Sequence, residues 1–277
     1  MTSKKLISNI LVLLFIPIIT ISCGIFFYDE NNNTNKSTYD NNNDLKNVYK
    51  VKEVIDGDTL VLANNERVRL LGVNTPEHGQ YYFEEAKEVL KMLVLGKEVK
   101  LEKDITDKDM YGRLLRYVFI GNLFVNEEMV KRGFANAFTF PPDVKYADKF
   151  IEAERTARSG ELGLWVKSKS SGIEIKINYD AAGDDKNNLN GEYVIFWNTN
   201  TYNLDLGDWT IKDSSTNIYE FKKFRLKSDS RVIIYSGKGK DDDKSLYWNS
   251  LKPVWNNDHD TLYLRDKDGL LVEIFSY

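Results

Sequence analysis

The sequence predicts two folded domains, one of strands and helices and one of strands alone, behind an N-terminal segment of a different kind. Its 277 residues correspond to about two ordinary domains. The 42% hydrophobic and 29% charged residues are ordinary for globular proteins, which argues against wholesale disorder and against a polytopic membrane protein. Strand and helix patterns are mixed up to residue 167, and only short strand patterns follow it.

The N-terminal segment has the pattern of an export signal or membrane anchor. Within residues 1–22, two lysines precede an apolar run that ends directly before the single cysteine, Cys23. This pattern resembles the lipobox of bacterial lipoproteins, whose cysteine is acylated, although Thr20 stands where leucine is usual. Residues 6–28 are also long enough to span a bilayer uncleaved, and an inert buried thiol is a third interpretation of Cys23. Both anchored forms place the rest of the chain outside the cytoplasm.

Residues 23–46 are expected to be a tether between this segment and the first domain. Eight of the 19 residues from 29 to 47 are asparagine, and only Tyr39 and Leu45 are sizeable apolar residues. Such a segment buries too little apolar surface to offset the entropy cost of ordering it. As a flexible coil, residues 29–47 would span roughly 22–26 Å root-mean-square.

Charge and rare residue types exclude several classes of function. The net charges of residues 1–46, 47–167 and 168–277 are 0, −1 and −3, so neither domain has the basicity of a general nucleic-acid coat protein. One cysteine cannot form an internal disulfide, and two histidines in unrelated contexts support neither a multi-histidine zinc site nor Ser-His-Asp chemistry. Any metal is therefore expected to be a hard cation bound by oxygen.

The first domain, residues 47–167, is predicted to contain three strands, a helix, two strands and two helices. Apolar runs predict the strands, and i, i+3, i+4 spacings predict the helices. Asn126 is expected to cap the second helix. The order is compatible with a small barrel carrying helices, although the pattern alone does not select that fold. In chain order the elements lie near residues 49–55, 60–62, 68–71, 81–95, 99–101, 113–120, 126–133 and 146–158.

The second domain, residues 173–277, follows a short polar linker, residues 168–172. Seven short strands separated by Gly- and Asp-rich turns predict a β-sandwich, with the tryptophans in core or edge packing. The predicted strands are residues 173–177, 192–197, 209–212, 219–221, 232–235, 261–264 and 271–274.

Three short segments of the first domain carry residue types that suit phosphate and a hard cation. They are Asp-Gly-Asp-Thr at residues 56–59, the stretch 69–77 that ends in Asn-Thr-Pro-Glu, and Tyr-Gly-Arg at 111–113. Each segment alone has an ordinary structural explanation, as a turn, a solvated strand face or a helix start. Together and in this order they resemble the staphylococcal nuclease family. The resemblance covers about residues 47–167 and implies an OB-type five-stranded β-barrel with three helices that cleaves DNA and RNA phosphodiesters with Ca²⁺.

By motif position, Asp58 resembles the family's calcium carboxylate, and Asn74 with Thr75 resembles its second calcium-binding stretch, Thr75 through the backbone carbonyl. The family usually has an acidic residue where this chain has Asn74. An amide still offers an oxygen but removes one formal charge, so weaker calcium binding and an altered metal preference are expected. Asp56 is expected to be a turn residue or an indirect neighbour of the metal.

The remaining motif residues resemble the family's catalytic groups. Arg69 and Arg113 match the pair that grips the scissile phosphate, where planar guanidiniums neutralise developing negative charge. Glu77 resembles the residue that positions or deprotonates the attacking water. Tyr111 and Tyr146 are further candidates for substrate contacts.

The second domain resembles the lamin-tail family at residues 192–198, 206–209 and 258–262. That resemblance implies an Ig-like sandwich and an attachment or interaction role with an unknown partner, not a reaction.

The leading hypothesis is a monomeric, calcium-dependent nuclease outside the cytoplasm, tethered to the membrane and acting on DNA, RNA or both. One alternative is a catalytically inactive OB-type module that binds nucleic acid or protein. Against it stands the retention of Asp58, Arg69, Glu77 and Arg113, because binding alone does not require that set. Another alternative is a surface attachment protein that acts through its second domain.

Overall fold

The computed structural model describes residues 47–277, all of which belong to one compact unit of the chain. The predicted export signal, the tether and Cys23 lie outside the described residues. From residue 47 onward, no helix is both long and apolar enough to cross a membrane.

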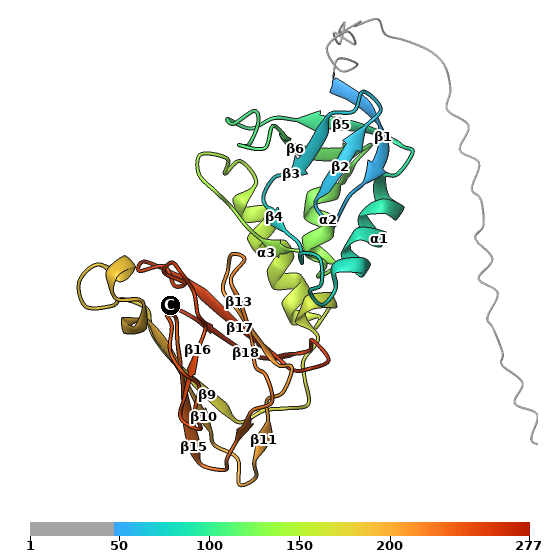
Figure 1. The fold of residues 1–277 in the computed structure, drawn as a ribbon. Coiled ribbons are helices and arrows are strands. Elements are labelled where there is room, and N and C mark those ends of the chain that lie inside the picture. The colour runs from blue at the N-terminus through green and yellow to red at the C-terminus, as the bar shows by residue number, and fades with distance from the viewer. Residues whose placement is uncertain (1–46) are drawn as a thin grey trace, which may run out of the picture. The chain divides into compact units, whose positions relative to one another are not determined.

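Five strands of the first domain form a closed barrel (Figure 1). Their order is β3-β2-β1-β5-β6, and a parallel pairing between β3 and β6 closes the sheet on itself. The strands are β1 (Val48–Val54), β2 (Thr59–Leu62), β3 (Arg67–Leu70), β5 (Glu98–Glu102) and β6 (Leu114–Ile120), with β7 (Leu123–Phe124) added beyond β6. The predicted OB-type five-stranded barrel is therefore confirmed.

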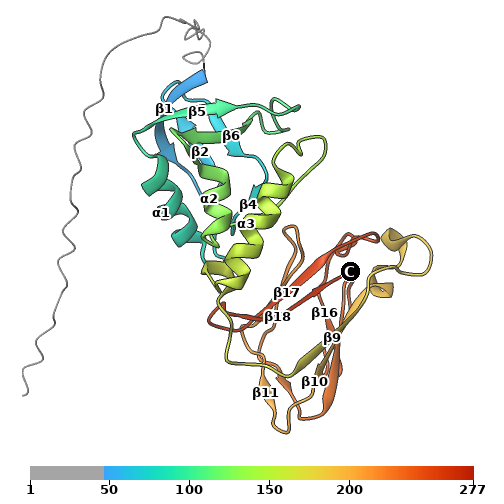
Figure 2. The ribbon, with the colours of Figure 1, turned by 180° about the vertical axis from the view of Figure 1, so that it is seen from behind.

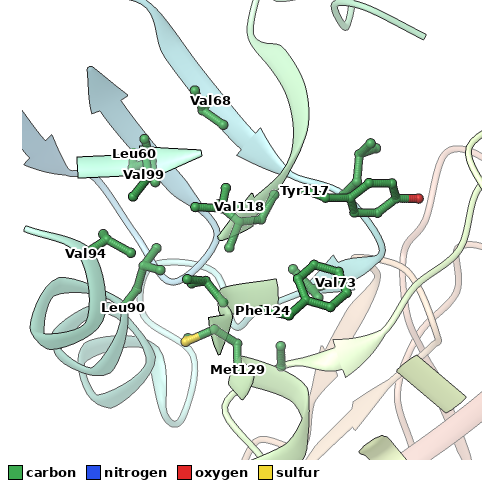
Figure 3. Close-up of a cluster of buried hydrophobic side chains, with 14 of the residues drawn as sticks. Leu60, Val68, Val73, Leu90, Val94, Val99, Tyr117, Val118, Phe124 and Met129 are labelled. Carbon is green, nitrogen blue, oxygen red and sulfur yellow. The ribbon is translucent and has the colours of Figure 1, made fainter. Parts of the chain in front are cut away.

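Three helices complete the domain: α1 (Phe83–Val94), α2 (Val125–Lys131) and α3 (Ala147–Ser159). Both views place α2 between the other two helices (Figures 1 and 2). Helix α1 begins two residues later than predicted, because Tyr82 has a left-handed backbone with φ of 70°. Side chains from the barrel and the helices, among them Leu60, Leu90 and Met129, share one core (Figure 3).

The prediction that Asn126 caps α2 is wrong. The helix begins at Val125, and Asn126 lies inside it with a fully buried side chain. Its Oδ1 accepts a hydrogen bond from the Val118 amide at 2.9 Å, and its Nδ2 donates to the Leu71 carbonyl at 2.8 Å. Asn126 therefore ties α2 to β6 and to the chain that leaves β3.

A short antiparallel pair, β4 (Val73–Asn74) with β8 (Asn136–Ala137), was not predicted. It follows Gly72, whose φ of +76° favours glycine. An added Cβ there would lie 2.0 Å from the Phe150 ring, so the missing side chain lets α3 pack against this turn. The turn thereby directs the chain from β3 into β4.

The second domain is a sandwich of two four-stranded sheets, ordered β16-β15-β10-β9 and β13-β12-β17-β18, beside the small pair β11-β14. Buried residues from both sheets form one core together with Trp209 and Trp255, which lie outside the strands, and this confirms the predicted all-β sandwich. The prediction missed three strands of only two or three residues: β11 (Leu204–Asp205), β14 (Arg225–Leu226) and β16 (Ser245–Tyr247).

The other strands of this domain are β9 (Ile173–Asn178), β10 (Tyr193–Asn198), β12 (Thr210–Lys212), β13 (Ile218–Glu220), β15 (Ser230–Tyr235), β17 (Thr261–Arg265) and β18 (Leu271–Ser276). Single 3₁₀ turns occur at Gly163–Trp165, Asp185–Asn187 and Leu189–Gly191. The first of these leads from α3 into the second domain.

Candidate active site

The turn between β1 and β2 places two carboxylates side by side. The Asp58 amide donates to Oδ1 of Asp56 at 3.0 Å, which fixes the turn. An added Cβ at Gly57 would lie 2.8 Å from the Ala86 Cβ and 2.9 Å from Thr75. The glycine therefore lets the turn pack closely against α1 and against the segment that contains Thr75.

Asp58 is buried and bound by Thr75. Its Oδ2 accepts hydrogen bonds from the Thr75 amide at 3.2 Å and the Thr75 hydroxyl at 2.9 Å. Its Oδ1 accepts one from the Thr59 hydroxyl at 3.1 Å. Asn74 directly precedes Thr75 at the end of β4 and is half-buried. The fold thus brings together the three residues that the sequence assigned to a metal.

The donor set around this turn suits a hard cation. Burial raises the pKa of Asp56, and the negative charge of Asp58 raises it further, so a nearby cation would relieve the repulsion between the two carboxylates. Asn74 and the Thr75 carbonyl add neutral oxygens. Between residues 47 and 277 no group of three or more His, Cys, Asp or Glu side chains could hold a metal, so an ion here would depend on those neutral oxygens as well.

Arg69 is held against the same carboxylate. It lies on β3 opposite Thr59 of β2, and its Nε is 3.0 Å from Oδ1 of Asp58. Its Nη1 donates to the carbonyls of Leu70 and Val73, at 2.5 and 2.9 Å. These contacts hold the guanidinium in one orientation at the edge of the carboxylate pair.

Arg113 reaches this place from the loop before β6. Its Nε donates to Oδ2 of Asp109 at 2.7 Å, and its Nη1 lies 3.4 Å from the Thr59 hydroxyl. Burial acts to raise the pKa of Asp109, but hydrogen bonds from Arg113 and from the Tyr111 amide outweigh it and leave that pKa below its ordinary value. Asp109 therefore stays charged and orients Arg113.

The sequence prediction missed Asp109 and Thr59. Thr59 directly follows Asp58, and Asp109 lies two residues before Tyr111, yet their contacts with Arg113 depend on side-chain directions. An acid four residues before an arginine, across a Gly-containing turn, is the only local signal that could have found Asp109.

The remaining three residues that the sequence predicts for the site lie in three different environments. Glu77 is exposed, directly after Pro76 and beyond Thr75. Tyr111 is 76% exposed, with its ring centre 5.6 Å from the Arg113 guanidinium, so a substrate could contact both. Tyr146 instead belongs to the aromatic core, since its ring packs edge-on against Tyr117. Its hydroxyl donates to Glu102 at 3.0 Å.

The arrangement has the properties of a site for a phosphate ester. Two guanidiniums converge beside a carboxylate pair, and each is oriented by hydrogen bonds that leave other N–H groups for a ligand. Fixed planar donors bind two phosphate oxygens at once. The exposed Glu77 carboxylate can accept a proton from water.

Comparisons with known proteins decide the family. The model of the family described as staphylococcal nuclease homologue matches residues 67–167. The thermonuclease of Staphylococcus intermedius is 38% identical over 128 residues, which are 43% of this chain and 76% of that protein. This chain belongs to the staphylococcal nuclease family. The model of the lamin tail domain matches residues 167–277, so a lamin tail domain follows the staphylococcal nuclease domain, as predicted.

Two further relatives match the same domain. The thermonuclease of Staphylococcus hyicus is 36% identical over 126 residues, covering 42% of this chain and 75% of the relative. Endonuclease YncB of Bacillus subtilis (strain 168) is 40% identical over 125 residues, covering 41% of this chain and 59% of the relative.

Proposed function

We propose that this chain is a calcium-dependent nuclease that hydrolyses phosphodiester bonds of DNA, RNA or both. The observation that supports it best is the convergence of Arg69 and Arg113 at the start of β2, 3.0 Å from Asp58 and 3.4 Å from Thr59. The names of the relatives, thermonuclease and endonuclease, point to the same chemistry.

Each residue has a distinct role in this proposal. Arg69 and Arg113 bind the scissile phosphate and neutralise the charge that develops on its oxygens. Asp109 holds Arg113 in place. Glu77 positions a water molecule and accepts its proton. Asp58, Asn74 and Thr75 would hold calcium, which would supply further positive charge as a Lewis acid.

A digestion assay tests the proposal. Plasmid DNA and a structured RNA are incubated with the chain in calcium or in excess chelator, and cleavage is followed over time. We expect cleavage only with calcium, and a loss of about 10²-fold or more in rate for Glu77→Gln. Glu98→Gln, an exposed carboxylate on β5, is the matched control and should keep the wild-type rate.

Two outcomes would contradict the proposal. Equal cleavage with chelator would remove the calcium dependence. Absence of cleavage of either nucleic acid would instead favour the inactive OB-type binding module.

We also propose that the chain acts outside the cytoplasm, tethered through its N-terminus. The support is the sequence pattern of residues 1–22 and the position of Cys23. Protease treatment of intact cells tests export, and metabolic labelling with a fatty acid tests acylation. Labelling that Cys23→Ala abolishes would identify the lipid anchor. Membrane retention of an unlabelled wild-type chain would identify the uncleaved helix instead.

A further inference from the structure

The staphylococcal nuclease domain and the lamin tail domain meet along a short, hydrogen-bonded junction. The Ser168 amide donates to the Leu271 carbonyl at 2.7 Å, and the Leu271 amide donates to the Val166 carbonyl at 2.9 Å. The chain that leaves the first domain thus pairs with the start of β18. Trp165 of the first domain packs in one buried cluster with Tyr263 and Leu271 of the second. The lamin tail domain is therefore held against the nuclease domain by buried contacts.

A cavity of about 480 Å³ lies beside this junction. Asn74, Thr75 and Tyr81 border it from the nuclease domain, and Lys212 and Arg265 border it from the lamin tail domain. Its volume is within the range of small-ligand sites in proteins. Two of the candidate metal residues therefore share a cavity with cationic side chains of the second domain.

The cavity lies at one end of a chain of contacts that runs through the candidate phosphate site. The Arg113 guanidinium lies 3.4 Å from the Thr59 hydroxyl, which donates to Asp58 at 3.1 Å. Asp58 also accepts a hydrogen bond from the Thr75 hydroxyl at 2.9 Å, and Thr75 borders the cavity. Tyr111 lies at the other end, beside Arg113. A strand whose phosphate is held by Arg113 can therefore extend past Tyr111 in one direction and into the cavity in the other.

Arg265 is a buried guanidinium without a carboxylate partner. It is 8% exposed, and its Nη1 donates to the carbonyls of Leu164 at 2.7 Å and Gly269 at 3.1 Å. Among residues 47–277 it makes no ion pair, and its Nε and Nη2 have no hydrogen-bond partner, although neither atom is fully enclosed by protein. Burial lowers its pKa to about 10, so it stays charged at neutral pH. A buried charge is costly unless it is paired, so these open N–H groups at the cavity wall indicate an anionic ligand.

The carboxylates that border the cavity do not neutralise Arg265. The Oδ1 atom of Asp266 accepts from two amides of its own turn at 2.9 Å each, and its Oδ2 accepts from the Ser168 hydroxyl. Asp208 and Glu220 are exposed, where water and salt screen their charges. Lys267, which is also exposed, adds a further cation at the cavity. The affinity for an anion is therefore local, although the domain as a whole is acidic.

We propose that this cavity binds the phosphate next to the scissile one in the nucleic-acid strand, with Arg265 of the lamin tail domain as its main contact. Tyr81, 39% exposed on the nuclease side of the cavity, offers a ring on which the base of that nucleotide can stack. A base stacked in this way is unpaired, so the substrate class at this position is single-stranded DNA or RNA. The inference rests on the proposed function and adds a contact to the same site.

Equilibrium binding in the absence of cleavage tests the cavity. A fluorescein-labelled oligothymidylate of about eight nucleotides is titrated with the full chain in excess chelator, and its Kd is measured by anisotropy at several salt concentrations. Arg265→Gln should raise the Kd about tenfold or more, as expected for loss of a hydrogen bond from a charged group. It should also reduce the slope of log Kd against log salt by about 0.7, the contribution of one phosphate contact on a single strand.

Arg231→Gln is the matched control, because it removes the same charge from β15 in the other sheet of the lamin tail domain. The Arg231 guanidinium lies 4.6 Å from the Trp197 ring centre, away from the cavity residues. This variant should change neither the Kd nor the salt slope.

A second variant separates phosphate binding from the junction contacts of Arg265. Thr210 of β12 borders the same cavity, and its side chain makes no hydrogen bond among residues 47–277. Thr210→Lys should tighten oligothymidylate binding several-fold and steepen the salt slope by about 0.7. A loosened junction could not produce that result, and thermal unfolding verifies that both variants are folded.

Three results would overturn the proposal. One is a Kd for Arg265→Gln within about twofold of the wild-type value with an unchanged salt slope. Another is a Thr210→Lys chain whose Kd and slope equal those of the wild type. The third is a duplex of the same length that binds as tightly as the single strand and depends equally on Arg265, which would contradict the assigned substrate class.

Failure of the proposed function gives a different set of results. A wild-type chain that cleaves neither DNA nor RNA, yet binds the oligothymidylate through Arg265, would contradict the nuclease and leave the role of the cavity intact. A wild-type chain that cleaves normally, with binding unchanged by Arg265→Gln, would contradict only the role of the cavity.

Discussion

The Nε atom of Arg69 lies 3.0 Å from the Oδ1 atom of Asp58, so the residue assigned to phosphate also contacts the residue assigned to metal. Only 16% and 7% of these two side chains are exposed. Salt screens such a pair less than a surface pair, and loss of one partner leaves a buried charge without compensation. A change at Arg69 should therefore affect both catalysis and stability.

Arg69→Lys tests this double role. Lysine keeps the charge but cannot make the forked contacts with Asp58 and the carbonyl of Val73. We expect a fall of at least about 10²-fold in kcat, as for loss of one preorganised donor. We also expect a loss of about 1–3 kcal/mol in the free energy of unfolding. Steady-state cleavage and urea unfolding measure the two effects.

The matched control is Arg155→Lys, because Arg155 is 69% exposed and pairs with Glu152 on the surface of α3. It should change neither quantity measurably. A wild-type kcat for Arg69→Lys would contradict the role of Arg69 in binding the phosphate.

Asp109→Asn should lower activity without changing how the metal is bound. The pKa of Asp109 is lowered, so the carboxylate that holds Arg113 contributes above the ordinary carboxyl pKa of about 3.9, and its contribution is lost as pH falls through the lowered value. In the wild type, Asp109 should therefore hold Arg113 in place from about pH 5 to pH 8. The kcat/KM of the variant should be up to about 10²-fold lower than that of the wild type, and the factor should be similar at each pH in that range.

Asp107→Asn controls for the charge change in the same loop, since Asp107 pairs with a different arginine, Arg116, at 2.6 Å. Its kcat/KM should stay near that of the wild type. A loss in Asp109→Asn that appears only at low pH would show that Asp109 does not orient Arg113.

Asn74→Asp should tighten calcium binding at a cost in stability without calcium. The new carboxylate adds a charged oxygen to the donor set, so the calcium concentration for half-activity should fall. Without calcium it adds a third negative charge next to Thr75, which binds Asp58, and the charge of Asp58 already helps burial to raise the pKa of Asp56. Calorimetry and thermal unfolding, each with and without calcium, measure both changes. Asn122→Asp, in the exposed turn after β6, adds the same charge away from the site and should change neither. If Asn74→Asp leaves the calcium concentration for half-activity unchanged, that result would argue against Asn74 as a ligand.

Several residues that the sequence selected lie close together in the fold, because they are adjacent to turns and strand ends that local patterns identify. The β2–β3 pairing places Thr59 opposite Arg69, and Asp58 directly precedes Thr59, so the pairing brings Arg69 near Asp58. The β4–β8 pair could not be predicted, because two residues carry no periodicity.

At Asn126 the sequence does carry a local signal, but that signal predicts the wrong position for the residue. An asparagine before two glutamates is typical of a helix N-cap, yet here the side chain turns inward to Val118 and Leu71. Asn126→Ala would leave a buried amide and a buried carbonyl without partners, each at about 1–3 kcal/mol. We therefore expect a loss of about 2–6 kcal/mol in the free energy of unfolding.

Urea unfolding measures that loss, and circular dichroism verifies that the variant folds. Asn122→Ala, at an exposed position four residues earlier, should stay within about 0.5 kcal/mol of wild type. Leu71 leads directly into Gly72 and β4, so Asn126→Ala should also speed amide exchange in β4, while exchange in β9 of the lamin tail domain stays unchanged. Equal stabilities of the two variants would mean that the buried bonds of Asn126 contribute nothing net, and the helix would then depend on its apolar packing alone.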